Sequence, residues 1–195
     1  MDIGAFLAGI SAADLLIFLF FMGFFVLGFA QGTIRRLIGI ASILFSFLFA
    51  ANVAEPLGSY LGANWAQFTP EYSKMLGFGT VFLAAAIAFA LVAQGFYKSQ
   101  PLFQNARFVD ELIGGILGLI QAGLIFGSVL IILDSVFAVP GVRVSPGEIG
   151  FLRDLWDALD PTRAASIFRE IAIPFAFALT GFLVPDSLER LYRRF

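Results

Sequence analysis

The residues that could do chemistry in this chain are few, and they stand in pairs beside apolar segments. Arg35 and Arg36 form a basic pair, and Asp110 and Glu111 form an acidic pair. Such groups can pair with each other or bind lipid phosphates. The 195 residues include no histidine and no cysteine. This removes the commonest general base near neutral pH and any thiolate nucleophile or metal ligand. We therefore expect no enzyme, no metal site and no cofactor.

Four further polar residues mark the apolar segments. Asp14 opens the first segment, and Asp134 follows the last long one. A carboxylate is disfavoured at a helix C-terminus, so Asp134 indicates a cation site or a contact with the tail, with plain solvation as the ordinary outcome. Gln94 and Gln121 lie inside apolar segments, where an interhelical hydrogen bond is the first expectation and a permeation path the alternative.

The composition indicates that these segments lie in a lipid bilayer. Hydrophobic residues make up 59% of the chain and charged residues 13%, and the mean hydropathy is +0.92. This balance excludes disorder and almost any water-soluble globular domain. The net charge of −2 offers no field for binding nucleic acid.

Runs without any charged residue reach the length of about 20 residues that a membrane-crossing helix needs. They cover residues 15–34, 37–54, 75–97 and 112–133. We predict an all-α membrane protein with four transmembrane helices in two hairpins, forming a domain over residues 1–137. The first reversal is expected at residues 28–32, because a continuous helix would place Arg35 and Arg36 at mid-membrane.

A tail over residues 138–195 follows this domain. Residues 151–159 place Leu152, Leu155 and Trp156 on one stripe, which predicts an amphipathic helix at the membrane interface or packed on the protein. The apolar segment 167–185 is too short to be assigned as a span. It is expected to be interfacial, re-entrant or packed on the bundle.

The distribution of basic residues favours an N-terminus outside the cell membrane. This orientation leaves Lys74 in the outer loop and places four basic residues inside, namely Arg35, Arg36, Lys98 and Arg107.

A stripe of small residues makes the segment 112–133 the expected centre of the bundle. Its members recur every four residues: Asp110, Gly114, Gly118 and Ala122. Glycines at this spacing let helix backbones approach closely in lipid. Alanines of the segment 75–97 offer a matching surface, whereas the phenylalanines of 15–34 are expected to face lipid.

The charged pairs predict a clamp between the two hairpins. In a four-helix serpentine both pairs start from the same membrane face, so Arg35 or Arg36 is expected to contact Asp110 or Glu111. The alternative is that all four charges are solvated separately among the headgroups, since exposed pairs contribute little.

These residues resemble the colicin V production protein family of bacterial inner-membrane proteins. The family pattern has an Asp at the first helix, R-G-x-x-R-E at the first turn, V-D-x-x-L-G-x-x-x-G at the fourth helix and L-D after it. The resemblance covers roughly residues 12–137. The positions that match or stand in these motifs are Asp14, Gly32, Arg35, Arg36, Asp110, Glu111, Gly114, Gly118 and Asp134.

The departures from the pattern sharpen the clamp hypothesis. Gln31 replaces an Arg, Arg36 stands where Glu is usual, and Glu111 stands where a basic residue is common. A direct contact between Arg36 and Glu111 would allow such an exchange of charges.

The resemblance implies a four-helix membrane protein needed for colicin V production or export, or for envelope integrity, and it carries over no catalytic residue. The leading hypothesis is a non-enzymatic scaffold or regulator, acting as a homo-oligomer or with an envelope or secretion partner. The alternative is a small transporter or channel in which Asp110, Glu111, Arg35 and Gln121 line a polar route. Its weakness is that every ionisable residue lies at a helix end, away from the midplane where transport sites commonly lie. An enzyme acting on lipid is the third and weakest hypothesis.

Overall fold

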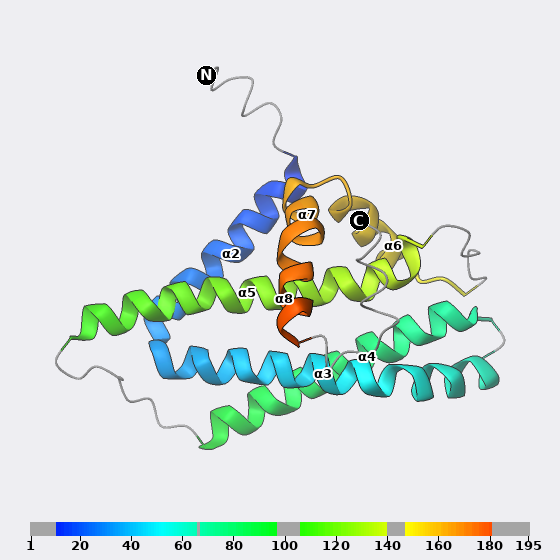
Figure 1. The fold of residues 1–195 in the computed structure, drawn as a ribbon, viewed down its shortest axis with the longest axis horizontal. Coiled ribbons are helices and arrows are strands. Elements are labelled where there is room, and N and C mark those ends of the chain that lie inside the picture. The colour runs from blue at the N-terminus through cyan, green and yellow to red at the C-terminus, as the bar shows by residue number, and fades with distance from the viewer. Residues whose placement is uncertain (1–10, 66, 97–105, 140–146, 181–195) are drawn as a thin grey trace.

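The computed structural model describes residues 11–65, 67–96, 106–139 and 147–180, and all regular structure within these ranges is helical (Figure 1). Four helices are long and apolar enough to cross a membrane: α2 (Ala12–Gln31), α3 (Thr33–Asn64), α4 (Pro70–Phe96) and α5 (Arg107–Phe137). The tail contributes α6 (Gly150–Leu159), α7 (Arg163–Ile167), the π-helical turn η1 (Phe168–Ala172) and α8 (Ile173–Thr180). The all-α, multi-pass membrane class is confirmed.

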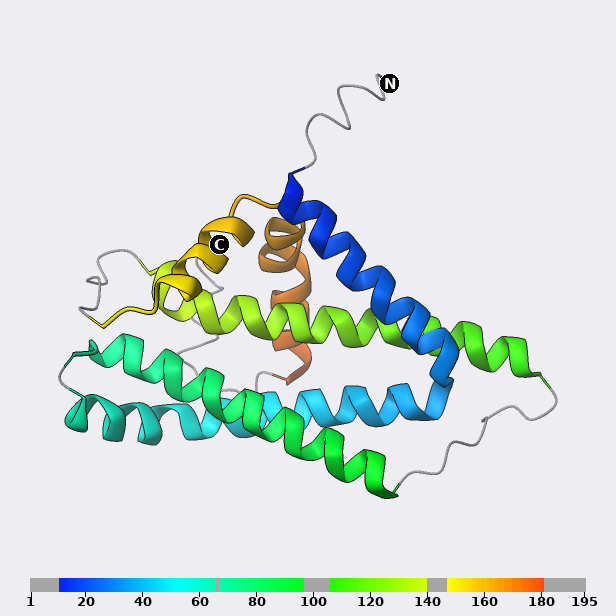
Figure 2. The same ribbon diagram turned by 180° about the vertical axis from the view of Figure 1, so that it is seen from behind.

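The long helices pack in pairs that do not follow chain order. α3 lies antiparallel beside α4, and α2 crosses the bundle to pack on α5 (Figures 1 and 2). α2 and α3 are consecutive in the chain but touch each other little, while α3 also contacts α5. The first hairpin is therefore held through the α5 helix and not by its own two arms.

A single residue joins the first two spans. α2 ends at Gln31 and α3 begins at Thr33, with Gly32 between them at φ 74° and ψ 177°. This conformation is open almost only to glycine. The reversal expected over residues 28–32 is thus confined to Gly32, and Gly28 stays inside α2, where it serves packing.

The long helices exceed the predicted limits of 37–54, 75–97 and 112–133. α3 continues past Pro56 to Asn64. An exposed proline costs one backbone hydrogen bond, and Gly58 packs so closely on α4 that an added Cβ would lie 2.5 Å from the Lys74 Cα. α4 begins at Pro70, a residue suited to a first helical turn. Packing between α3 and α4 therefore extends both helices beyond their apolar stretches.

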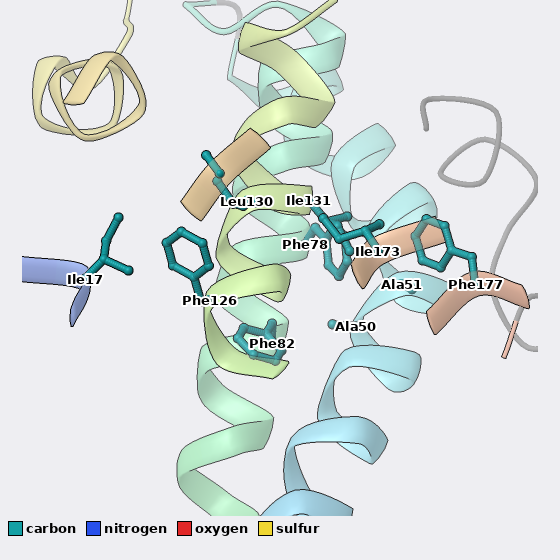
Figure 3. Packing of buried hydrophobic residues seen from close by; sticks show 11 residues of the cluster. Ile17, Ala50, Ala51, Phe78, Phe82, Phe126, Leu130, Ile131, Ile173 and Phe177 are labelled. Atoms are coloured by element: carbon teal, nitrogen blue, oxygen red, sulfur yellow. The ribbon is translucent and has the colours of Figure 1, made fainter. Parts of the chain in front are cut away.

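The tail shares one hydrophobic core with the spans. Ala165, Ile173 and Phe177 from the tail join buried side chains of α2, α3, α4 and α5, several of which are labelled in Figure 3. The apolar segment 167–185 packs on the bundle through residue 180, which was one of the expectations for it. Residues 181–185 lie outside the described residues.

Candidate functional site

A close helix contact joins α2 to α5 through glycines. A Cβ added at Gly114 would lie 2.5 Å from the carbonyl oxygen of Gly28, and one at Gly118 would collide with the Phe24 carbonyl. The glycine stripe therefore does bring two backbones together. Its partner is α2, however, and not the alanine surface of α4.

Phenylalanines of α2 use this same contact, contrary to the expectation that they face lipid. The ring of Phe25 lies against Gly115. Phe21 packs edge-on against Phe126, with 6.1 Å between ring centroids. Glycines on α5 leave room for rings as well as for backbone, so only part of the α2 surface, including Phe18, stays exposed.

Asp110 lies buried where the Gly32 joint meets α5. It is 4% exposed, and its carboxylate occupies the space that a side chain at position 32 would need. Its backbone carbonyl accepts a hydrogen bond from Thr33 Oγ1 at 3.0 Å. The start of α3 and the start of α5 are thereby tied together.

The predicted clamp between basic and acidic pairs is wrong. Arg36 is 5% exposed and donates to Gln121 Oε1 at 2.8 Å and to Gln31 Oε1 at 2.9 Å. Glu111 instead accepts from Arg107 at 2.8 Å, one turn earlier on its own helix. Because Thr33 is already level with Asp110, the side chain of Arg36 lies deeper in the bundle and reaches Gln121.

Two departures from the family pattern meet in this arrangement. Gln31 and Arg36, which stand where Arg and Glu are usual, are hydrogen-bonded to each other. Arg36 therefore has a partner on the neighbouring turn of the same chain, whereas Glu111 pairs with Arg107. Gln121 makes the interhelical hydrogen bond expected of it, with Arg36 of α3. The expectation for Gln94 falls on a side chain that the structure does not describe.

A cavity of about 310 Å³ opens beside Arg36, bounded by all four long helices. Its polar wall is formed by Gln31, Arg35, Arg36, Ser42 and Gln121. Its other lining residues are Phe24, Leu27, Ile38, Gly39, Ile43, Ala86 and Ala90. Such a space, with cationic and apolar walls, suits an anionic or amphiphilic ligand.

At the opposite end of α5, Asp134 contacts the tail, one of the outcomes considered for it. It is fully buried and accepts from Arg169 Nε at 2.8 Å and Nη2 at 2.7 Å, and from Trp156 Nε1 at 2.9 Å. Arg169 also donates to Asp160 at 2.7 Å. This cluster fixes both α6 and η1 on the end of α5.

Burial acts against the charge of Arg169, but its pKa is nevertheless raised above the ordinary value. The hydrogen bonds and negative charges of Asp134 and Asp160 outweigh desolvation. The guanidinium is therefore a permanent cation. Sequence reasoning missed Arg169, and the only signal was the unfavourable position of Asp134 at a helix C-terminus.

Asp14 has a local role at the start of α2. Its backbone N–H donates to Ser11 Oγ at 3.0 Å, and its carboxylate accepts from the Ser11 backbone N–H at 3.3 Å. This reciprocal arrangement is a capping box. Asp14 thus satisfies the helix terminus and lies apart from the Asp110 and Asp134 sites.

Comparison with family models gives a match over residues 13–153 to the family described as Colicin V production protein. The match includes all four spans and the first residues of α6. Comparison with curated proteins and with solved structures gave no match.

Proposed function

We propose that this chain, which belongs to the colicin V production protein family, acts as a non-enzymatic scaffold or regulator of toxin export or envelope integrity. Family membership links the membrane protein to colicin production. The proposal goes further and assigns the action to helix packing, with a second copy or a secretion or envelope protein as the partner.

The placement of charge along the spans supports this proposal. In α5 no ionisable residue stands between Glu111 and Asp134, and in α3 none stands between Arg36 and Glu55. The intervening turns of α5 pack through Gly114, Gly118 and Ala122, all of which are buried. Spans that carry their charges at the helix ends suit a structural role better than the conduction of ions.

We further propose that the protein lies in the bacterial inner membrane with its N-terminus outside. Arg35, Arg36 and Arg107 gather at the end of the bundle that carries Gly32. An excess of basic residues marks the cytoplasmic side. The opposite end, with Asp134 and α6, then lies on the periplasmic side.

The test combines toxin secretion with ion flux. The wild-type chain is expected to restore colicin V secretion to a host that lacks its own family member, while the purified protein gives no flux in sealed proteoliposomes at any pH. The Asp110→Asn variant serves as the comparison in both assays. The scaffold proposal would be contradicted if the wild-type chain restored neither colicin V secretion nor the resistance of the cell envelope.

A transporter is the second candidate, and the cavity beside Arg36 is the observation that favours it. Its polar wall, which includes Arg36, Ser42 and Gln121, would be the site of passage. This function requires a flux from the wild-type protein that the Asp110→Asn substitution removes. Such a result would replace the scaffold proposal.

A further inference from the structure

The cavity beside Arg36 carries an excess of positive charge. Neither Arg35 nor Arg36 forms an ion pair with a carboxylate of the described residues, whereas Arg107, Arg153 and Arg169 each do. Arg36 is held by amide oxygens, which orient a guanidinium without neutralising it. A buried cation of this kind favours a negatively charged partner.

Arg36 also retains hydrogen-bonding capacity. A guanidinium has five N–H donors, and the two glutamines occupy only part of this set. Its Nε is buried and has no hydrogen-bond partner among the described residues. The remaining donors match the oxygens of a phosphate group, which arginine commonly binds through two parallel hydrogen bonds.

The charged residues of the cavity lining lie beside the Gly32 joint. Gln31, Arg35 and Arg36 flank the Gly32 joint. Phe24 and Ile43 lie about two to three turns further along α2 and α3 from this joint. The cavity therefore offers cationic groups beside the joint and, further along the helices, apolar side chains together with Ser42 and Gln121.

We propose that this cavity is a binding site for a phosphate-bearing amphiphile, an anionic phospholipid of the surrounding bilayer. Its phosphate contacts Arg35 and Arg36, and the upper part of an acyl chain lies against Phe24, Leu27 and Ala86. The chemistry that would recognise the ligand is shared by free inorganic phosphate, but the apolar wall favours the lipid. This inference does not depend on the scaffold function.

The experiment measures lipid retention by the purified full chain in detergent, using native mass spectrometry. Phosphatidylglycerol is compared with phosphatidylcholine. We expect the wild type to prefer phosphatidylglycerol and Arg36→Gln to reduce its retention by about tenfold or more. Arg107→Gln is the matched control, because this exposed arginine lies at the same end of the bundle but outside the cavity. Its lipid retention should equal that of the wild type.

A second variant tests the apolar wall and leaves both arginines in place. Ala86→Phe on α4 is expected to exclude the lipid. Inorganic phosphate should still bind to this variant in a titration. Phosphatidylglycerol retention unchanged in a folded Ala86→Phe variant would overturn the lipid assignment and leave free phosphate as the ligand. Equal retention of the two lipids by the wild type, or no effect of Arg36→Gln, would overturn the site itself. If Arg36→Gln does not fold, the preference of the wild type between the two lipids still tests the site, and Ala86→Phe still tests the lipid assignment.

Discussion

The two buried arginines, Arg36 and Arg169, differ in whether a carboxylate neutralises their charge. Arg169 is neutralised by Asp134 and Asp160, while Arg36 is hydrogen-bonded to Gln31 and Gln121 and lies over the Phe24 ring. Removing one partner of a buried ion pair leaves the other charge desolvated, which costs more than the pair itself contributes. The Asp134 cluster is therefore a stability determinant, whereas Arg36 is open to a ligand.

Asp134→Ala should lower the free energy of unfolding by about 3–5 kcal/mol, because it leaves Arg169 buried without its main counter-ion. Thermal unfolding in detergent, followed by circular dichroism, measures the change. Asp157→Ala is the control, since Asp157 is exposed on α6. Equal stabilities of the two variants would contradict the role given to Asp134.

The same cluster can be replaced by an apolar pair. Asp134→Leu combined with Arg169→Met should recover most of the stability lost by Asp134→Ala, because neither charge is then left alone in the interior. The same unfolding measurement applies. A double variant less stable than Asp134→Ala would show that Asp134 and Arg169 stabilise the fold by more than their mutual ion pair.

Sequence reasoning reached these residues only in part. Asp110, Asp134 and Gln121 stood out because a polar residue beside or inside an apolar segment is unusual. Arg169 did not, because its partner lies 35 positions away and the contact depends on how the tail folds back. The choice of Gln121 over Glu111 as the partner of Arg36 depends on helix register, which charge patterns do not encode.

At the scale of elements, glycine determines which helices meet. The four-residue spacing on α5 predicted a close contact correctly, but not that α2 would be the partner. Small residues on α4 were an equally good match by composition. Shape complementarity between Phe24 or Phe25 and the glycine surface decides the pairing, and it becomes visible only in three dimensions.

Gly118→Ala should destabilise the bundle by about 1–3 kcal/mol through overpacking against the Phe24 backbone. Gly23→Ala is the matched control, because nothing lies within 4 Å of a Cβ at that position of α2. There the substitution should be neutral or gain up to about 1 kcal/mol from helix propensity. Chemical unfolding in mixed detergent gives both values. A stable Gly118→Ala variant would rule out the backbone contact.

The Gly32 joint provides a separate prediction. Gly32→Ala should cost about 1–3 kcal/mol, since alanine is disfavoured at this positive φ and its Cβ would collide with the Asp110 carboxylate. Gly150→Ala, at an open position at the start of α6, should change stability little. Melting temperatures compare the two. A shift of the same size in both would argue against strain at the joint.

The molecule as a whole is polarised along its long axis. One end carries the Gly32 joint, Arg107 and the proposed lipid site, and the other carries Asp134 and α6, while α8 crosses the middle of the bundle (Figure 1). Hydropathy predicted the number of spans because the bilayer sets their length. It missed the extensions of α3 and α4, because protein contacts and not lipid hold those turns.

Orientation can be tested cleanly because the chain contains no cysteine. A single cysteine introduced as Asn64→Cys at the end of α3 should react with a membrane-impermeant maleimide added from the periplasmic side. Ala106→Cys, before α5, should react only after the inner membrane is opened. The reverse pattern would place the N-terminus in the cytoplasm.

The distant pairing of α2 with α5 also sets an order of assembly. α2 is complete once Gln31 has been made, but its packing partner is finished only at Phe137. At a synthesis rate of about 5–20 residues per second, α2 waits on the order of ten seconds in the membrane. The adjacent helices α3 and α4 can associate during that time. Closure of the first helix on the fourth is thus the late step of biogenesis. A ribosome stalled before Arg107 would leave the face of the first helix that carries Phe24 and Gly28 without its packing partner.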